Sequence, residues 1–391
     1  MKRNRLMSTG LIPVLILLLC GIRVSVWAQD TSRLRVSVIT CGPGAEFIGA
    51  SFGHSAIRII DSVQRTDEAY NYGTFDFDQP HFGLRFAQGS LIYSLSRYPY
   101  RDFLREYEYY RRGVQEQVLN LSAADKRYLQ DLLEENLLPQ NRGYIYSSVY
   151  DNCATRVRDV LEKAIGADLS WGEATGSQKI TYRQAFNAHL TNDPWQKFGI
   201  NILTGIPVDQ VMSSRAAMYL PEFLYAGIAG ATVKGRPLLQ QSQEILPQGI
   251  VLPAETPLTS VFWVLLCLSA LTLIFLLRPQ THRLGMSLGK AQVFLSGLLG
   301  ILMLVMWFAT DHNICRDNLN LLWALPTNVL FPFFKKPRTR YALIAMALIV
   351  LVPVLHLAGI QQFPLGELWP LLLCLLFVFG LSYRKGMRNS A

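Results

Sequence analysis

Cys153 is the residue of this sequence best suited to covalent chemistry, because of what precedes it. It follows Asp151 and Asn152, two residue types that often cap the N-terminus of a helix. In the first turn of such a helix, free backbone N–H groups and the helix dipole stabilise a thiolate and lower the pKa of the thiol. We therefore predict a nucleophilic cysteine at the start of a helix over residues 152–165. Asp151 and Asn152 are candidates for substrate contacts, or serve only as helix caps.

A cysteine nucleophile also needs a nearby base, which is usually histidine. His54 begins a predicted strand over residues 53–63, which would hold its imidazole rigidly, and Arg58 lies on the same face of that strand. The next predicted strand carries Asn71 and Tyr72, and either could orient the imidazole. Because successive strand residues face opposite sides, only one of them can do so. Arg58 is a further candidate for contact with a substrate.

The elements that must position these side chains lie between residues 29 and 235, which we predict to form one domain. Its alternating and helical patterns indicate an α+β fold with an antiparallel sheet. The predicted strands are 33–40, 53–63, 68–77, 91–98 and 114–121, and the predicted helices are 102–112, 122–138 and 152–165. Residues 236–257 contain four prolines and several glutamines, and we expect them to be a linker.

The N-terminus has the pattern of a secretory signal. A basic start precedes an apolar stretch over residues 11–20, and small residues at Val26 and Ala28 fit cleavage after Ala28. Cys20 suggests a lipoprotein signal instead, but the residue before it is not small; an uncleaved signal anchor is another alternative. We predict a signal peptide over residues 1–28 and a periplasmic location for the domain that follows.

Residues 258–391 are predicted to be a membrane domain. Four apolar runs (258–277, 291–309, 341–360 and 368–382) approach the roughly 20 residues that a spanning helix needs. A fifth, 319–334, is shorter and contains two prolines, so it is a kinked span or a re-entrant segment. With five spans, ten of eleven Lys and Arg residues fall on the cytoplasmic side, as the positive-inside rule requires. We therefore expect five transmembrane helices.

The net charge of +9 does not indicate nucleic-acid binding. Residues 1–28 carry four basic residues and no acid, and residues 256–391 carry 11 basic and 3 acidic residues, which leaves −3 for the rest. Nucleic-acid binding would concentrate basic residues in the soluble domain. Here they flank apolar runs, so they determine topology.

Polar residues lie at the predicted outer face of the membrane domain. Asp311 and His312 follow the second span, and Asn318 and Asn320 begin the third. Polar groups at this depth often mark a functional site, although an ordinary wet loop explains them equally well. One His–Asp pair supplies too few ligands for a metal, so we predict neither a metal nor an organic cofactor.

A disulfide is the main alternative role for Cys153. The predicted periplasmic domain has one other cysteine, Cys41, and an oxidising compartment favours pairing. Cys315, in the loop after the second span, is another possible partner. The protein would then be a non-catalytic binding or sensor protein, with His54 an ordinary structural histidine.

Five segments occur in an order that resembles the Lnb family of lipoprotein N-acyltransferases. They are 41–44 (CGPG), 51–54 (SFGH), 70–77 (YNYGTFDF), 151–156 (DNCATR) and 318–326 (NLNLLWALP). Members of this family join an N-terminal periplasmic domain to a five-helix membrane domain. More distantly, the order of histidine and Asn-Cys is similar to that of lecithin:retinol acyltransferase-like proteins, which have a circularly permuted papain-like fold. That resemblance implies that Cys153 is the nucleophile and His54 the base, and it leaves Asn71 and Tyr72 open as the third member.

The resemblance implies acyl transfer in the bacterial inner membrane. The acyl donor would be a membrane phospholipid, and the acceptor would be the α-amino group of a diacylglyceryl lipoprotein, with a thioester on Cys153 between the two steps. A membrane-anchored cysteine peptidase or amidase that acts on cell-wall peptides is an alternative, because the same Cys and His pair serves hydrolysis.

Overall fold

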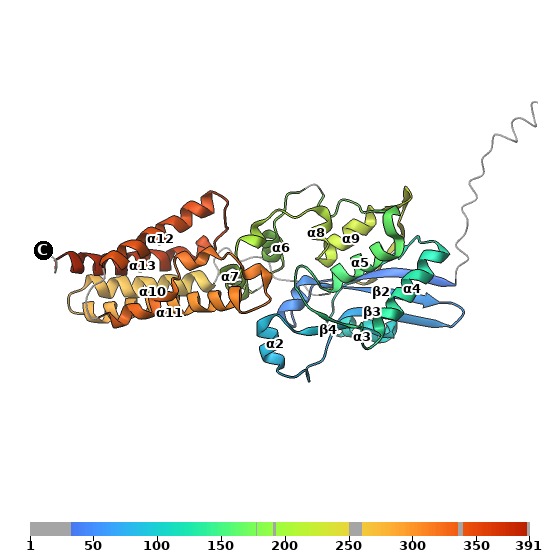
Figure 1. Cartoon of the computed structure of the whole chain (residues 1–391), viewed down its shortest axis with the longest axis horizontal. Helices are drawn as coiled ribbons and strands as arrows, with labels where there is room; N and C mark the ends of the chain where they lie inside the picture. The colour runs from blue at the N-terminus through green and yellow to red at the C-terminus, as the bar shows by residue number, and fades with distance from the viewer. Residues whose placement is uncertain (1–32, 177, 191–192, 250–259, 335–338, 389–391) are drawn as a thin grey trace, which may run out of the picture.

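The computed structural model describes residues 33–176, 178–190, 193–249, 260–334 and 339–388 (Figure 1). An α+β domain and a helical C-terminal part follow one another along the long axis of the molecule. The predicted signal peptide and its cleavage site lie outside the described residues, as do the basic residues at 335–338.

An antiparallel sheet is the framework of the α+β domain, which confirms that part of the predicted fold. Within the described residues it has seven strands, and every neighbouring pair is antiparallel. In spatial order the strands are β10 (Leu239–Leu246), β5 (Val114–Leu119), β1 (Leu34–Cys41), β2 (His54–Asp61), β3 (Thr66–Phe75), β4 (Ile92–Pro99) and β6 (Gly143–Ile145).

Helices cover both faces of this sheet. On one face, α4 (Ala123–Leu137) and α5 (Cys153–Ile165) pack on a core that includes Val36, Ile57 and Tyr70. On the other, α3 (Tyr100–Tyr109) buries Phe103 and two tyrosines against Ile39 and Ala56. The further elements of the domain are η1 (Ile48–Phe52), α2 (Phe82–Gln88), η2 (Gly166–Asp168), β7 (Leu169–Ser170), α6 (Tyr182–His189), α7 (Pro194–Leu203), η3 (Ile206–Asp209), α8 (Ser214–Ala217), α9 (Pro221–Ala229), β8 (Thr232–Val233) and β9 (Arg236–Pro237).

The predicted linker over residues 236–257 is wrong in its first half. Residues 239–246 form β10, which pairs with β5 at the edge of the sheet, so the folded domain continues to at least Leu246. In the strand LQQSQEIL no side chain is fully buried and half are exposed, because it lies at the edge of the sheet. It therefore lacks the apolar alternation by which strands are recognised. Residues 250–257 lie outside the described part of the chain.

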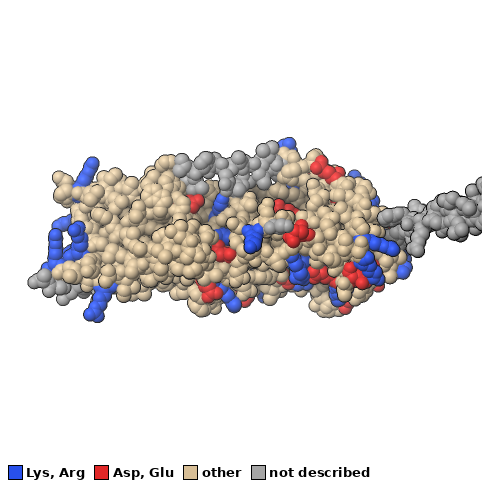
Figure 2. All heavy atoms as spheres, turned by 90° about the horizontal axis from the view of Figure 1, so that it is seen from above, with Lys and Arg blue, Asp and Glu red and all other residues tan. Residues whose placement is uncertain are grey.

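The C-terminal part is a bundle of apolar helices. Among the described helices, three are long and apolar enough to cross a membrane: α11 (His282–Phe308), α12 (Thr339–Leu357) and α13 (Leu365–Arg388). A fourth, α10 (Ser260–Leu277), is apolar throughout but shorter. Figure 2 shows basic side chains gathered at the end of the bundle remote from the α+β domain, as expected if that end faces the cytoplasm.

The fifth apolar run forms no long α-helix in this structure. It consists of two 3₁₀ segments, η5 (Leu319–Leu322) and η6 (Pro326–Phe333), because prolines at both ends of η6 prevent a continuous α-helical hydrogen-bond ladder. The segment packs along α11, where a side chain at Gly300 would collide with the Ala324 carbonyl. At its far end, Lys290 Nζ lies 3.5 Å from the Pro332 carbonyl oxygen. The count of five spanning helices stays a prediction.

Asparagines join the bundle to the α+β domain. The Asn318 side chain donates to the Ile202 carbonyl of α7 at 2.7 Å, and the Asn320 side chain donates to the same carbonyl at 3.1 Å. Trp323 Nε1 in turn donates to Asn320 Oδ1 at 2.9 Å. Both asparagines are fully buried. They therefore form a buried, hydrogen-bonded joint between the α+β domain and the bundle.

Candidate active site

Cys153 occupies the first position of α5, as the sequence predicts. Asn152 is the cap: its Oδ1 accepts hydrogen bonds from the backbone N–H groups of Ala154 and Thr155, both at 3.0 Å. The Thr155 hydroxyl returns a bond by accepting from the Asn152 N–H at 2.7 Å, which completes a capping box. The Asn152 amide also donates to the Tyr219 carbonyl at 3.0 Å. This cap fixes the helix start that carries the thiol, and it is buried, so Asn152 has a structural role.

The thiol of Cys153 lies against the imidazole of His54, 99 residues earlier in the chain. The two side chains are close enough to shift each other's pKa, and the backbone N–H groups of Ser55 and Ala154 also act to lower the pKa of the thiol. His54 can meet the thiol because both residues lie at the ends of their elements, His54 as the first residue of β2 and Cys153 as the first residue of α5. The structure therefore brings together the two residues that the sequence proposes as nucleophile and base.

Asn71, and not Tyr72, completes the constellation. Asn71 Oδ1 lies 2.7 Å from His54 Nε2. The hydroxyl of Tyr72 points to the other face of the sheet, where it donates to Asn136 Oδ1 at 2.9 Å. Alternation along β3 separates the two neighbours, as the sequence requires. Asn71 is thus placed to position the imidazole, and Tyr72 belongs to the core beneath α4 and α5.

The partners of Asn71 define which imidazole nitrogen carries the proton. Asn71 Oδ1 accepts from the Gly73 N–H at 2.7 Å, and its Nδ2 donates to the Tyr98 hydroxyl at 2.7 Å. The oxygen must therefore be the atom that faces His54, and Nε2 must carry a proton to donate to it. In neutral His54 this leaves Nδ1 unprotonated, facing Cys153. That is the tautomer a base needs in order to take the thiol proton.

The pKa values of Cys153 and His54 shift toward each other. Burial raises the pKa of the thiol, but the positive charge and hydrogen bond of His54, with the two backbone N–H groups, more than compensate and lower it. Burial lowers the pKa of His54, but the Cys153 thiolate and the bond to Asn71 raise it above its ordinary value. The environment therefore favours a thiolate–imidazolium pair, the reactive form of a cysteine nucleophile.

Gly73 and Tyr98 are parts of this site that the sequence analysis did not single out. A Cβ atom on Gly73 would lie 2.5 Å from His54 Cε1, so only glycine leaves room for the ring. A glycine inside a strand is itself a signal of close approach by another group. Tyr98, on β4, holds the amide of Asn71. No sequence signal identifies that tyrosine, because it depends on the pairing of β3 with β4.

Tyrosines of β4 and of the β6 region lie near the thiol. Cys153, Tyr93 and Tyr146 all pack against the core cluster that contains Tyr144. Burial raises the pKa of Tyr93 to about 12, and the negative charge of Cys153 adds to that rise. The Tyr93 and Tyr146 rings stack with centroids 4.2 Å apart. The nucleophile thus has aromatic rings nearby, a surrounding that suits an apolar substrate group.

The other candidate residues lie elsewhere. Arg58 is paired with Asp67 and Glu116 and lies over the Tyr100 ring, on the α3 face of the sheet. Asp151 forms a two-pronged ion pair with Arg156 one turn into α5. The Asp311 N–H donates to the Gln88 carbonyl of α2 at 2.8 Å, and the His312 ring packs against Gly89. With Asn318 and Asn320 in the joint to α7, none of these side chains contacts Cys153 among the contacts described.

The cysteines of the described residues are all unpaired. Cys41 sits opposite His54 in the β1–β2 pairing, and burial raises the pKa of its thiol to about 12. Cys315 is also buried and free. The described part of the chain holds no group of three His, Cys, Asp or Glu side chains that could bind a metal.

Family comparisons agree with this division of the chain. The family model of the Lnb N-terminal periplasmic domain matches residues 27–188, and that of the Lnb transmembrane domain matches residues 252–390. The chain belongs to the Lnb family. It is therefore a membrane protein with a periplasmic domain, of a family associated with lipoprotein maturation.

The Lnb match also locates the candidate site. His54, Asn71 and Cys153 all fall within the Lnb periplasmic domain, and the joint formed by Asn318 and Asn320 falls within the Lnb transmembrane domain. Comparisons with curated proteins and with solved structures gave no match. The relation to a permuted papain-like fold stays a prediction.

Proposed function

We propose that this protein is an N-acyltransferase that moves a fatty acyl chain from a membrane phospholipid to the N-terminal cysteine of a lipoprotein. The observation that carries the proposal is the Cys153–His54 pair, oriented by Asn71, in a chain that belongs to the Lnb family. A membrane-tied thiolate next to a proton donor suits acyl transfer between two lipid-anchored substrates. No metal or organic cofactor takes part.

The first step forms a thioester. The Cys153 thiolate attacks an ester carbonyl of the phospholipid, and the new C–S bond replaces the C–O bond. His54, protonated in the resting pair, gives its proton to the departing lysophospholipid oxygen. The backbone N–H of Cys153, at the first helical position without an intrahelical partner, is available to stabilise the oxyanion.

The second step returns the enzyme to its starting state. The α-amino group of a diacylglyceryl cysteine attacks the thioester carbonyl, and the C–N bond replaces the C–S bond. Neutral His54 takes the proton released by the amine, and the thiolate is restored beside the imidazolium. Two covalent half-reactions of this kind give ping-pong kinetics.

The proposed substrates explain why the catalytic domain is attached to a membrane domain. Donor and acceptor are both held in the bilayer by acyl chains, so a released soluble domain would meet them only by adsorption to the surface. We propose a multi-pass inner-membrane location with the active site on the periplasmic side. The basic end of the bundle, remote from the α+β domain, supports this orientation.

A thioester trap tests the proposal. Membranes with the wild type, Cys153→Ala or Cys267→Ala are incubated with phospholipid that carries a labelled acyl chain, and the protein is then treated with neutral hydroxylamine. We expect hydroxylamine-sensitive label on the wild type and on Cys267→Ala, whose thiol lies exposed on α10, and none on Cys153→Ala. Equal labelling of all three, or none on folded wild type, contradicts the proposal.

A further inference from the structure

The helix α2 is unusual because it buries none of its residues. Its seven residues are too few for a helix to be stable without packing. Large apolar side chains on and beside it face outward: Phe77 is 72% exposed, Leu84 57% and Phe86 61%. Ile92 and Ile145, paired across β4 and β6, extend the same exposed surface. We call these five residues the α2 patch.

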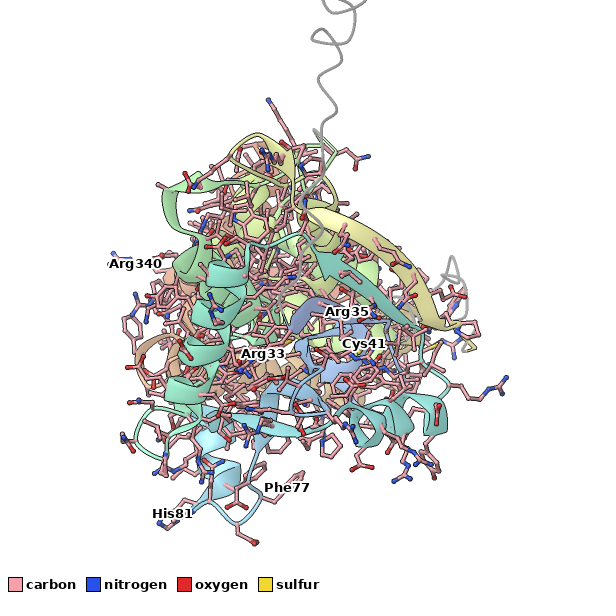
Figure 3. All side chains as sticks on the ribbon, turned by 90° about the vertical axis from the view of Figure 1, so that its right-hand side faces the viewer. Arg33, Arg35, Cys41, Phe77, His81 and Arg340 are labelled. Atoms are coloured by element: carbon pink, nitrogen blue, oxygen red, sulfur yellow. The ribbon has the colours of Figure 1, made fainter. Side chains whose placement is uncertain are left out.

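The α2 patch is organised and not a loose loop. Phe75, Phe77 and Phe82 form a ring cluster, with the Phe77 centroid 4.8 Å from Phe75 and 5.2 Å from Phe82. Gln79 ties the segment to β4 by two hydrogen bonds with the backbone of Ile92. The surface is thus held in place with its apolar side chains turned outward. Figure 3 shows Phe77 at the periphery of the molecule, pointing away from the rest of the chain.

The position of α2 relative to the bundle indicates what covers this patch. The last residue of α2, Gln88, accepts a hydrogen bond from the Asp311 N–H, and Gly89 contacts His312. Asp311 comes three residues after the end of α11, a helix long enough to span a membrane, and α11 ends in the stacked aromatic pair Trp307 and Phe308. Aromatic side chains of this kind mark the interface of a bilayer. Figure 1 shows α2 on the side of the domain that faces the bundle.

We propose that the α2 patch inserts into the outer leaflet of the membrane that α11 crosses, with the acyl chains of phospholipids as its partner. An exposed apolar surface at this height meets the boundary between headgroups and acyl chains, where burial of its side chains is favourable. The charged groups of the segment, Asp76, Asp78 and Arg85, must stay at the level of the headgroups, because burial of an unpaired charge is costly. Asp76 accepts from the Asp78 N–H, and the Arg85 guanidinium donates to the Pro80 carbonyl.

The aromatic cluster continues from the patch toward the thiol. Phe75 contacts Tyr93 with centroids 4.9 Å apart, and Tyr93 stacks on Tyr146, which like Cys153 packs against the core of the domain. A chain of ring contacts therefore connects the patch with the core against which Cys153 packs. Insertion of the patch does not depend on which reaction Cys153 performs.

Photocrosslinking in a bilayer tests the insertion. The full-length protein, with benzoyl-phenylalanine in place of Phe77, Phe86 or Val63, is reconstituted in phosphatidylethanolamine–phosphatidylglycerol vesicles, irradiated and analysed by intact-mass spectrometry. Val63 is the matched control: it is 70% exposed, but it lies in the β2–β3 turn at the opposite end of β2 from His54. Benzoyl-phenylalanine in place of Leu271, exposed on α10, marks full lipid contact.

The expected result is a mass increase of one phospholipid at positions 77, 86 and 271 and none above background at 63. The proposal would be overturned if positions 77 and 86 gave no more lipid crosslinking than position 63 while position 271 was labelled. Crosslinks from 77 and 86 to a second protein chain in place of lipid would also overturn it and identify the patch as a protein-binding surface. Since these positions are exposed, the substitutions leave the folded core intact.

Discussion

Replacement of Asn71 by alanine tests the reasoning about the site most directly. Asn71→Ala removes the acceptor that holds His54 Nε2 at 2.7 Å, while Cys153 and its helix cap stay in place. A hydrogen bond to a charged group contributes about 1.5–3 kcal/mol, so we expect a loss of about 10- to 150-fold in the acylation rate of Cys153. The assay is the single-turnover transfer of a labelled acyl chain from phospholipid to protein.

The pH profile of Asn71→Ala separates an effect on the imidazole from a general defect. The bond from Asn71 raises the pKa of His54, so its loss lowers that pKa and moves the alkaline limb of the rate profile to lower pH. A less charged His54 stabilises the thiolate less, so the pKa of Cys153 rises and the acid limb moves to higher pH. The bell-shaped profile therefore narrows from both sides.

Two further variants provide the controls. Tyr72→Phe removes a hydroxyl that contacts Asn136 on the opposite face, so we expect its acylation rate and pH profile to match the wild type. Asn71→Asp keeps an acceptor for His54 and for the Gly73 N–H, so we expect it to restore part of the rate and to move the alkaline limb upward. An Asn71→Ala protein with wild-type rate and profile would refute the assigned role.

Two more predictions concern the supports of the pair. In Gly73→Ala, the added methyl displaces the His54 ring, so alkylation of Cys153 at neutral pH should slow by about tenfold or more; Gly83→Ala, whose added carbon meets nothing within 4 Å, should not change it. Asn152→Ala should lower the free energy of unfolding by about 0.5–2 kcal/mol and raise the thiol pKa, measured by thermal unfolding and the pH dependence of alkylation. Ser122→Ala, which removes the cap of α4, should lower stability similarly without moving that pKa, and a matching shift there would contradict a local role for Asn152.

The parts of the site that the sequence could predict are those encoded locally. Asp151-Asn152-Cys153 shows a helix start, and His54 shows a polar residue at the start of a strand. The sequence alone does not predict whether Asn71 or Tyr72 contacts His54, because that depends on which face of β3 meets His54. That is decided by the pairing of Ile57 with Tyr70 and by the irregularity between Asn71 and Thr74.

Two parts of the fold were not predicted from the sequence. In one, apolar residues do not recur at the spacing of a strand, and in the other their pattern fits more than one kind of helix. The polar edge strand β10 has no alternation of apolar and polar residues, and the prolines around it are typical of a linker. In residues 319–334, hydropathy measures only how apolar a segment is. It does not distinguish an α-helix from the 3₁₀ segments that Pro326 and Pro332 impose and that the glycines of α11 accommodate.

The asparagine joint between η5 and α7 has a geometric consequence for substrate choice. Amide hydrogen bonds buried in a low-dielectric interior are costly to break, so the joint resists separation of η5 from α7. In the proposed reaction, this joint limits how far the thiol can move from the bilayer. In the proposed transfer, an acceptor must bring its amine to the thiol while its own lipid stays anchored, so this joint would favour amines attached close to their lipid over those further along a chain.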